Sequence, residues 1–259
     1  MVDGICELYH QYSSEKMMLS KKITLPIIII FSFLLGQEQN MSWATYWSES
    51  GKKVLSDKTN QKLLGYSALT ALAVTQIDMS VKNYIQANKI LSDPVSRFGD
   101  DYGGDWAHWI LWSSIITTSV MNNNSSSEIF SKMQFSTFAM LTNGIITETM
   151  KRSFGRVRPN GGCCKSFPSG HTSHSYTIAA IAHELYGNQV GALAYGLATL
   201  VAVSRMNDNK HYLSDVIFGA ALGTSIGRAF STQYHENIFG KANIDILPTM
   251  ALRISYPLD

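Results

Sequence analysis

Three clusters of cations, histidines and glycine stand out in a chain of 259 residues of which only 15% are charged. They are Lys151 with Arg158-Pro159, the run Pro168-Ser169-Gly170-His171, and Ser204-Arg205 followed by His211 and Asp215. A single Arg or Lys at a helix end is usually a solvated cap, and a single histidine in an apolar helix usually packs. If the fold brings all three clusters into one pocket, they could take part in binding and catalysis rather than in capping and packing.

The basic residues of these clusters are suited to bind phosphate. Lys151, Arg158 and Arg205 would bring three cations together, which are too many to bury without an anion. The planar guanidinium group grips phosphate oxygens in pairs, and lysine adds a point charge. Ser169 and Gly170 are expected at a helix N-terminus, where free backbone N–H groups and the helix dipole favour an anion. We therefore expect these five residues to bind a phosphate group.

The two histidines could supply nucleophilic and acid–base catalysis. If Asp208 or Asn209 caps the last long helix, His211 and Asp215 lie four residues apart on one helical face. Asp215 would then accept the Nδ1–H bond of His211 and leave Nε2 as the nucleophile. His171 would protonate the departing alkoxide and then activate water. We expect no metal ion or other cofactor, because the cations already neutralise the developing charge.

The three clusters resemble the motifs of the type 2 phosphatidic acid phosphatase superfamily. The matching patterns are Lys151-x6-Arg158-Pro159, Pro168-Ser169-Gly170-His171 and Ser204-Arg205-x5-His211-x3-Asp215, in the order and spacing of that superfamily. The resemblance implies an all-α, acid-phosphatase-like bundle, a phosphohistidine intermediate on His211 and general acid catalysis by His171. It also implies phosphate contacts from Lys151, Arg158, Ser169, Gly170 and Arg205.

The elements that position these motifs are predicted to be helices. Apolar runs dominate the body of the chain, and no long alternating run indicates a sheet before the C-terminus, so we expect a bundle of about six core helices. The predicted helices cover residues 63–77, 107–121, 129–154, 169–186, 190–206 and 210–230. Gly219, Gly223 and Gly227 share one face of the last helix, where another backbone can approach closely.

Other polar residues are interpreted as structural. Residues 100–106 contain clustered glycines and acids and predict a loop. Asp100, Asp101 and Asp105 within it match no calcium-binding spacing, so we interpret them as a solvated acidic loop. His108 and His183 are assigned to packing. His174, one helical turn beyond His171, could reach the edge of the pocket, but we interpret it as a packing or solvated polar residue.

The chain is predicted to have three parts. Residues 1–36 form an export leader or an N-terminal anchor, residues 37–240 the phosphatase domain, and residues 241–259 a strand-like tail. The leader is inferred from Lys21-Lys22 followed by the uncharged stretch 23–36, and a start at Met17 or Met18 would make it compact. We expect export to the cell envelope, at its periplasmic or extracytoplasmic face. The short apolar runs favour a soluble or peripheral bundle over an integral membrane protein.

These features predict a metal-independent phosphatase acting on phosphomonoester or pyrophosphate groups of lipids, with the membrane surface as a partner. A net charge of +2 gives no case for nucleic-acid binding. One alternative is a vanadium haloperoxidase, which would hold vanadate in the same pocket and oxidise halide. The other is a non-catalytic protein of the envelope that binds phosphate or lipid. The intact His171, His211 and Asp215 argue against that second alternative, since binding requires only the cations.

Overall fold

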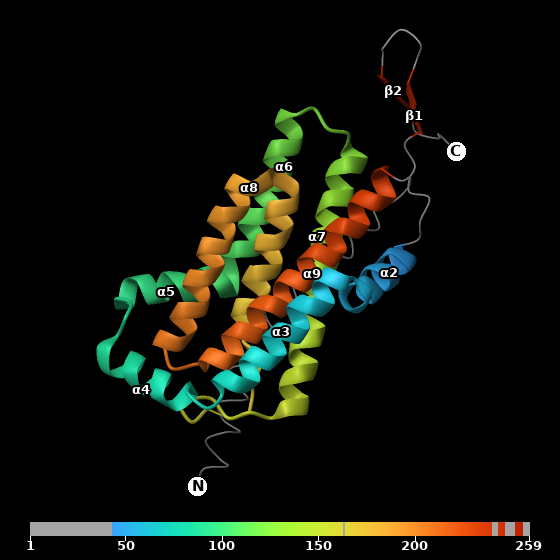
Figure 1. Ribbon diagram of the computed structural model, residues 1–259. Helices are drawn as coiled ribbons and strands as arrows, with labels where there is room; N and C mark the ends of the chain where they lie inside the picture. The colour runs from blue at the N-terminus through green and yellow to red at the C-terminus, as the bar shows by residue number, and fades with distance from the viewer. Residues whose placement is uncertain (1–42, 163, 240–242, 247–251, 256–259) are drawn as a thin grey trace.

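The computed structural model describes residues 43–162, 164–239, 243–246 and 252–255, and this part of the chain forms a bundle of helices (Figure 1). The elements before the motifs are α2 (Trp43–Ser56), α3 (Lys58–Val74), α4 (Asp78–Asn88), α5 (Asp93–Asp101), the π-helix η1 (Tyr102–Trp106) and α6 (Ala107–Met121). The motifs lie on or beside α7 (Ser126–Phe154), α8 (Gly170–Asn207) and α9 (Leu213–Phe239). The predicted all-α bundle is therefore confirmed, while the predicted leader lies outside the described residues.

Two short strands follow the bundle, in the segment that is strand-like in sequence. Strands β1 (Asn243–Ile246) and β2 (Leu252–Ser255) pair antiparallel. Their register sets Asn243 opposite Ser255 and Ile246 opposite Leu252. Among the described helices, none combines the length and the apolar character that a membrane span requires.

The hydrophobic core lies around α8 and α9. Helix α9 packs against α8, α3, α2 and α7, so it runs through the middle of the bundle (Figure 1). Ile181 and Val201 of α8, Ile226 and Phe230 of α9, and Phe135 of α7 are completely buried. Burying a side chain of this size contributes about 1.5–3 kcal/mol to stability. This core fixes the three helices that carry the motifs relative to one another.

Helices α8 and α9 approach each other closely along the predicted glycine face. A Cβ atom on Gly219 would lie 2.9 Å from the carbonyl oxygen of Ser169, and one on Gly223 would overlap the carbonyl oxygen of Ser173. A Cβ on Gly227 would also meet the backbone of α8. Because a real side chain cannot occupy these positions without displacing α8, the glycines allow the start of α8 to lie against α9. The expected close approach is confirmed.

Helix α8 turns back on itself at Gly187. This residue has φ 81° and ψ −172°, a backbone conformation open essentially to glycine alone. A straight helix of 38 residues would be about 57 Å long and would hold His171 and Arg205 at opposite ends. Figure 1 instead shows α8 as two adjacent helical arms joined at one end of the bundle. The two helices predicted before and after residues 187–189 are these arms.

Residues 100–106 are helical, and the prediction of a loop is wrong. Helix α5 ends at Asp101 and η1 continues to Trp106. A Cβ on Gly103 would lie 2.5 Å from Val201 in the second arm of α8, and Tyr102 is buried. The clustered glycines thus serve close packing between helices, which composition alone does not distinguish from a turn.

Candidate active site

The first motif lies at the end of α7 and in the loop that follows. Lys151 is buried in the last turn of α7, and the helix ends at Gly155, which has φ 55° and donates its N–H to the Lys151 carbonyl at 3.1 Å. This left-handed glycine stops the helix where the sequence predicts and directs the chain towards Arg158. A Cβ on Gly170 would lie 3.5 Å from Nζ of Lys151, so the ammonium group lies beside the start of α8.

The second motif forms the N-terminus of α8. Ser169 is the N-cap residue, is completely buried, and shares a hydroxyl–hydroxyl hydrogen bond of 2.9 Å with Thr172. Its backbone N–H donates to the carbonyl oxygen of Asp215 at 3.1 Å. Gly170 is the first residue of the helix, so the backbone N–H groups that favour an anion face the same region as Lys151.

The third motif differs from the sequence expectation in one respect. Helix α9 begins at Leu213, so His211 lies in the turn before α9 and does not share a helical face with Asp215. The backbone N–H of His211 donates to the Arg205 carbonyl at 3.2 Å, and Asn209 has φ 58°, so the turn extends further than the predicted cap. The pair is nevertheless retained, because Nδ1 of His211 lies 3.6 Å from Oδ2 of Asp215. That separation is an ion-pair distance and exceeds a hydrogen bond.

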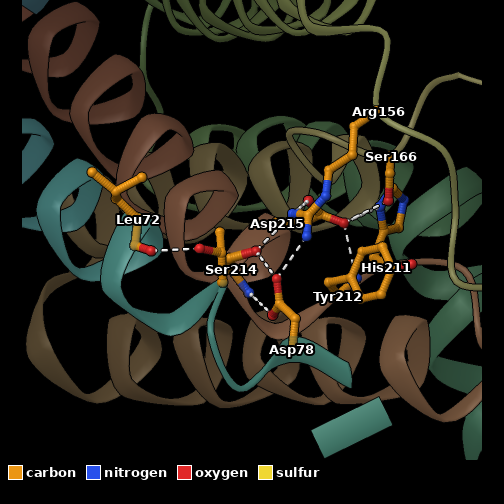
Figure 2. A network of polar contacts seen from close by, with 9 residues as sticks. Leu72, Asp78, Arg156, Ser166, His211, Tyr212, Ser214 and Asp215 are labelled. Atoms are coloured by element: carbon orange, nitrogen blue, oxygen red, sulfur yellow. Dashed lines mark hydrogen bonds and ion pairs between the residues drawn. The ribbon is translucent and has the colours of Figure 1, made fainter. Parts of the chain in front are cut away.

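The carboxylate of Asp215 is completely buried, and both of its oxygens accept hydrogen bonds (Figure 2). Oδ2 accepts the hydroxyl of Ser166 at 2.6 Å and the backbone N–H of Tyr212 at 2.8 Å. The contact to Tyr212 is that of a capping box, in which the third helical residue bonds back to the N-cap residue. Oδ1 accepts Nη1 of Arg156 at 2.6 Å. Burial alone would raise the pKa of Asp215, but His211 and the hydrogen bonds from Ser166 and Tyr212 hold that pKa below its usual value.

The side chains of His171 and Arg205 both contact Asp100, an acid that the sequence predicts to lie in a solvated loop. Oδ1 of Asp100 lies 3.3 Å from Nε2 of His171 and also pairs with Nη1 of Arg205. A Cβ on Gly104 of η1 would lie 3.0 Å from the same Nε2 atom. The interpretation of Asp100 is therefore wrong: α5 and η1 pack against α8 and bring this carboxylate to the motifs.

The motif side chains influence one another electrostatically, which indicates a single site. Burial lowers the pKa of His211 to about 3, and Lys151 and Arg205 contribute to the lowering. Desolvation, followed by Lys151 and Arg158, lowers the pKa of His171 to about 4. Burial and then Arg158 lower the pKa of Lys151 itself to about 8. Positive charge thus accumulates around two neutral imidazoles, an arrangement that favours binding of an anion.

Of the other histidines, His108 and His174 pack against each other, and His183 makes a polar contact. The rings of His108 and His174 meet edge to face with centroids 5.8 Å apart. Nε2 of His183 lies 3.0 Å from Oδ1 of Asn188, next to the corner of α8. Sequence reasoning missed Arg156 and Ser166, both of which contact Asp215. Arg156 stands two residues before Arg158 in a chain with few charges, and that spacing was the available signal.

Comparison with known families identifies the domain that contains these motifs. Residues 135–239 match the PAP2 superfamily, and this range includes every predicted site residue. The superfamily that the motifs predict is thus the one that this part of the chain matches.

Known relatives are phosphatases. The chain is 40% identical over 80 residues to lipid A 1-phosphatase of Porphyromonas gingivalis, covering 30% of this chain and 18% of that protein. It is 30% identical over 142 residues to lipid phosphate phosphatase 1 of Arabidopsis thaliana, covering 39% of this chain and 43% of that protein. The chain thus spans less than half the length of these relatives.

A solved structure shares the fold. It is a transmembrane PAP2 type phosphatidylglycerolphosphate phosphatase from Bacillus subtilis, with a TM-score of 0.55 and 18% sequence identity. The match covers 68% of this chain and 96% of that one.

Proposed function

We propose that this protein is a phosphatase that releases inorganic phosphate from phosphorylated lipids through a phosphohistidine intermediate on His211. The observation that carries the proposal is an asymmetry between the two imidazoles. His211 is buried with its Nδ1 towards the carboxylate of Asp215, whereas His171 is 37% exposed at its side chain. A nucleophile needs a fixed orientation, and an acid–base group needs access to the leaving group and to water.

In the first step, Nε2 of His211 attacks phosphorus, and an N–P bond forms while the P–O bond to the lipid breaks. His171 gives its proton to the departing oxygen. Asp215 holds the ring of His211 and stabilises the positive charge that develops on it. In the second step, water attacks phosphorus, His171 accepts a proton from that water, and the N–P bond breaks to release phosphate.

The remaining motif residues stabilise the phosphoryl group during both steps. They are the side chains of Lys151, Arg158 and Arg205 and the backbone of Ser169 and Gly170. Because the charge on the equatorial oxygens increases in the transition state, cations and N–H groups fixed in advance lower the barrier. The reaction as proposed requires no metal ion, and we expect activity to persist in the presence of EDTA.

Two observations support a lipid as the substrate. The relatives with matching sequence are named for lipid A and lipid phosphate. Exposed aromatic side chains also flank the segment that contacts His171: Phe98, Trp106 and Trp109 are between 41% and 51% exposed. Phe98 and Trp106 line an open cleft of about 280 Å³ beside α5 and η1. Aromatic rings at a polar boundary suit contact with lipid.

The test is phosphate release by the His211→Ala variant, with lipid and soluble substrates, detergent and EDTA. We expect the loss of the nucleophile to lower kcat by at least about a thousandfold while the circular dichroism spectrum stays unchanged. Labelled substrate should leave phosphate on the wild-type chain, trapped under alkaline conditions, and none on this variant. The matched control is His183→Ala, a histidine in the same bundle at the corner of α8, which should keep wild-type activity.

More than a few per cent of wild-type activity in folded His211→Ala would contradict the assignment of the nucleophile. Halide oxidation with added vanadate, combined with no phosphate release from any substrate, would favour the haloperoxidase alternative instead.

A further inference from the structure

Asp78 is a buried acid for which the proposed mechanism has no role. It is the first residue of α4 and is 2% exposed. Its Oδ1 accepts the backbone N–H of Ser214 at 3.0 Å, and its Oδ2 accepts the hydroxyl of the same residue (Figure 2). Ser214 is the second residue of α9, where backbone N–H groups have no partner within the helix. A carboxylate from α4 therefore caps the helix that begins two residues after His211.

Arg156 connects Asp78 to Asp215. Its Nη2 donates to Oδ2 of Asp78 at 2.7 Å, and its Nη1 donates to Oδ1 of Asp215 at 2.6 Å. Nη1 also donates to the hydroxyl of Ser214 at 2.7 Å, and the guanidinium carbon lies 4.3 Å from the centre of the Tyr212 ring. The planar guanidinium group thereby sets the distance and the angle between the two carboxylates, which a lysine could not do.

The charges of Asp78, Arg156 and Asp215 stabilise one another. Two buried carboxylates share one guanidinium group, and neither acid is more than 2% exposed. Without the charge of Asp78, Arg156 would be attracted to Asp215 alone, and α9 would lose an anion at its N-terminus. Both changes would alter the position of Asp215. A small movement of Asp215 would weaken its contact with His211, because the distance of 3.6 Å between Oδ2 and Nδ1 already exceeds that of a hydrogen bond.

We propose that Asp78 is a positioning residue that acts through Arg156 to hold Asp215 towards His211. Asp78 lies on α4, outside residues 135–239 that match the PAP2 superfamily. A helix that precedes the matched region therefore supplies a residue that supports the proposed active site. This inference rests on the proposed function, in which His211 is the nucleophile.

The decisive variant is Asp78→Asn, which keeps the shape of the side chain and an oxygen for the N–H of Ser214 but removes the charge. We expect kcat to fall by about ten- to a hundredfold, with KM and inhibition by inorganic phosphate within about twofold of wild type. These two binding measures should hold because the phosphate-binding cations remain in place. The matched control is Asp57→Asn, since Asp57 caps α3 by accepting the N–H of Asn60 at 2.9 Å and lies outside this network. That control should leave kcat unchanged.

A second pair of variants tests the path from Asp78 to Asp215. Arg156→Gln should lower kcat to a similar extent, and adding Asp78→Asn to it should lower kcat by less than about a further twofold. If Asp78→Asn does not fold, Arg156→Lys keeps a cation and loses the planar fork, and it should show the same loss in kcat without a change in KM.

Spectroscopy provides a measurement that is independent of turnover. The ¹⁵N chemical shifts of the His211 ring report which nitrogen carries the proton, and we expect Nδ1–H in wild type and a mixture of tautomers in Asp78→Asn. An unchanged ring signal, a kcat within twofold of wild type, or a fall in kcat matched by weaker phosphate binding would each overturn the proposal. Absence of phosphatase activity in wild type would instead refute the proposed function, and the ring signal would still decide the role of Asp78.

Discussion

A histidine that donates a proton must be protonated when the substrate is bound, and the surroundings of His171 in the protein oppose this. Desolvation, together with Lys151 and Arg158, lowers its pKa to about 4. A phosphate dianion brings negative charge next to the ring and raises this pKa again. Substrate binding should therefore be coupled to uptake of a proton by His171.

The pH dependence of the two kinetic constants should reveal this coupling. The profile of kcat/KM reports the free enzyme, and the profile of kcat reports the complex. We expect kcat/KM to decline as the pH rises above about 4, and kcat to decline only at a higher pH, after correction for the titration of the substrate. His211, whose pKa is about 3, stays neutral over this range.

Replacement of His171 by Asn serves as the control for this prediction, because it should abolish the basic limb of both profiles in the residual activity. Identical limbs for kcat and kcat/KM in wild type would show that phosphate does not alter the protonation of His171.

The short motifs predicted the residues of the proposed site. They did not predict the residues that contact these from the loop between α7 and α8, such as Arg156 and Ser166, or from other elements. Lys151, His171 and His211 could be predicted because their types and spacing define a chemistry. Asp100 could not be, because its role depends on the packing of α5 against α8. Asp78 is separated from Ser214 by more than half of the chain, and no local pattern connects the two.

At the scale of elements, the contact between α8 and α9 determines where the N-terminus of α8 lies, which we propose binds phosphate. Substitution of Gly223 tests that contact most directly, because a Cβ atom there would overlap the carbonyl oxygen of Ser173. We expect Gly223→Ala to lower the free energy of unfolding by about 1–3 kcal/mol and to lower activity, because α8 must move away from α9. Urea unfolding followed by circular dichroism measures the first effect, and phosphate release measures the second.

Gly196, on the exposed side of α8, provides the control for this prediction. A Cβ there meets no atom within 4 Å, so Gly196→Ala should raise the free energy of unfolding by about 0.5–1 kcal/mol and leave activity unchanged. Equal effects of the two substitutions would contradict the importance of the close contact.

Helix boundaries could be predicted where a single residue ends a helix. Gly155 ends α7 and Gly187 divides α8, in agreement with the predicted helices. The apolar runs did not reveal α2, and they suggested a loop at the end of α5 and in η1. These elements are partly polar and are stabilised by packing on α8 and α9, a tertiary effect that local patterns do not contain.

At the scale of the whole molecule, the neutral histidines of the site should make folding sensitive to acid. The folded-state pKa values of His171 and His211 are about 4 and about 3, below the ordinary value of 6.5. The unfolded chain therefore binds protons at these residues as the pH falls below 6.5, while the folded chain does not. Their contribution to stability is complete above pH 6.5 and is lost as the pH falls towards 4 and then 3.

Thermal unfolding between pH 7 and pH 5 measures this effect, in a range above the ordinary pKa values of carboxylates. We expect Tm to fall over this range, and inorganic phosphate to raise Tm by binding only to the folded state. The double variant His171→Asn/His211→Asn should show a flatter dependence on pH. A wild-type Tm that does not change between pH 7 and pH 5 would contradict the prediction.

The corner at Gly187 has a consequence for how such a chain can change in length. His171 and Arg205 lie near the ends of the two arms of α8. The position of each along its helix axis therefore depends on the number of residues between it and Gly187. One residue inserted into one arm alone would advance its end by about 1.5 Å and rotate it by about 100°. Additions that preserve the site should therefore come in whole turns on both sides of Gly187, about seven residues in each arm, since about seven residues nearly complete two turns. They would lengthen the bundle and leave the facing of His171 and Arg205 nearly unchanged.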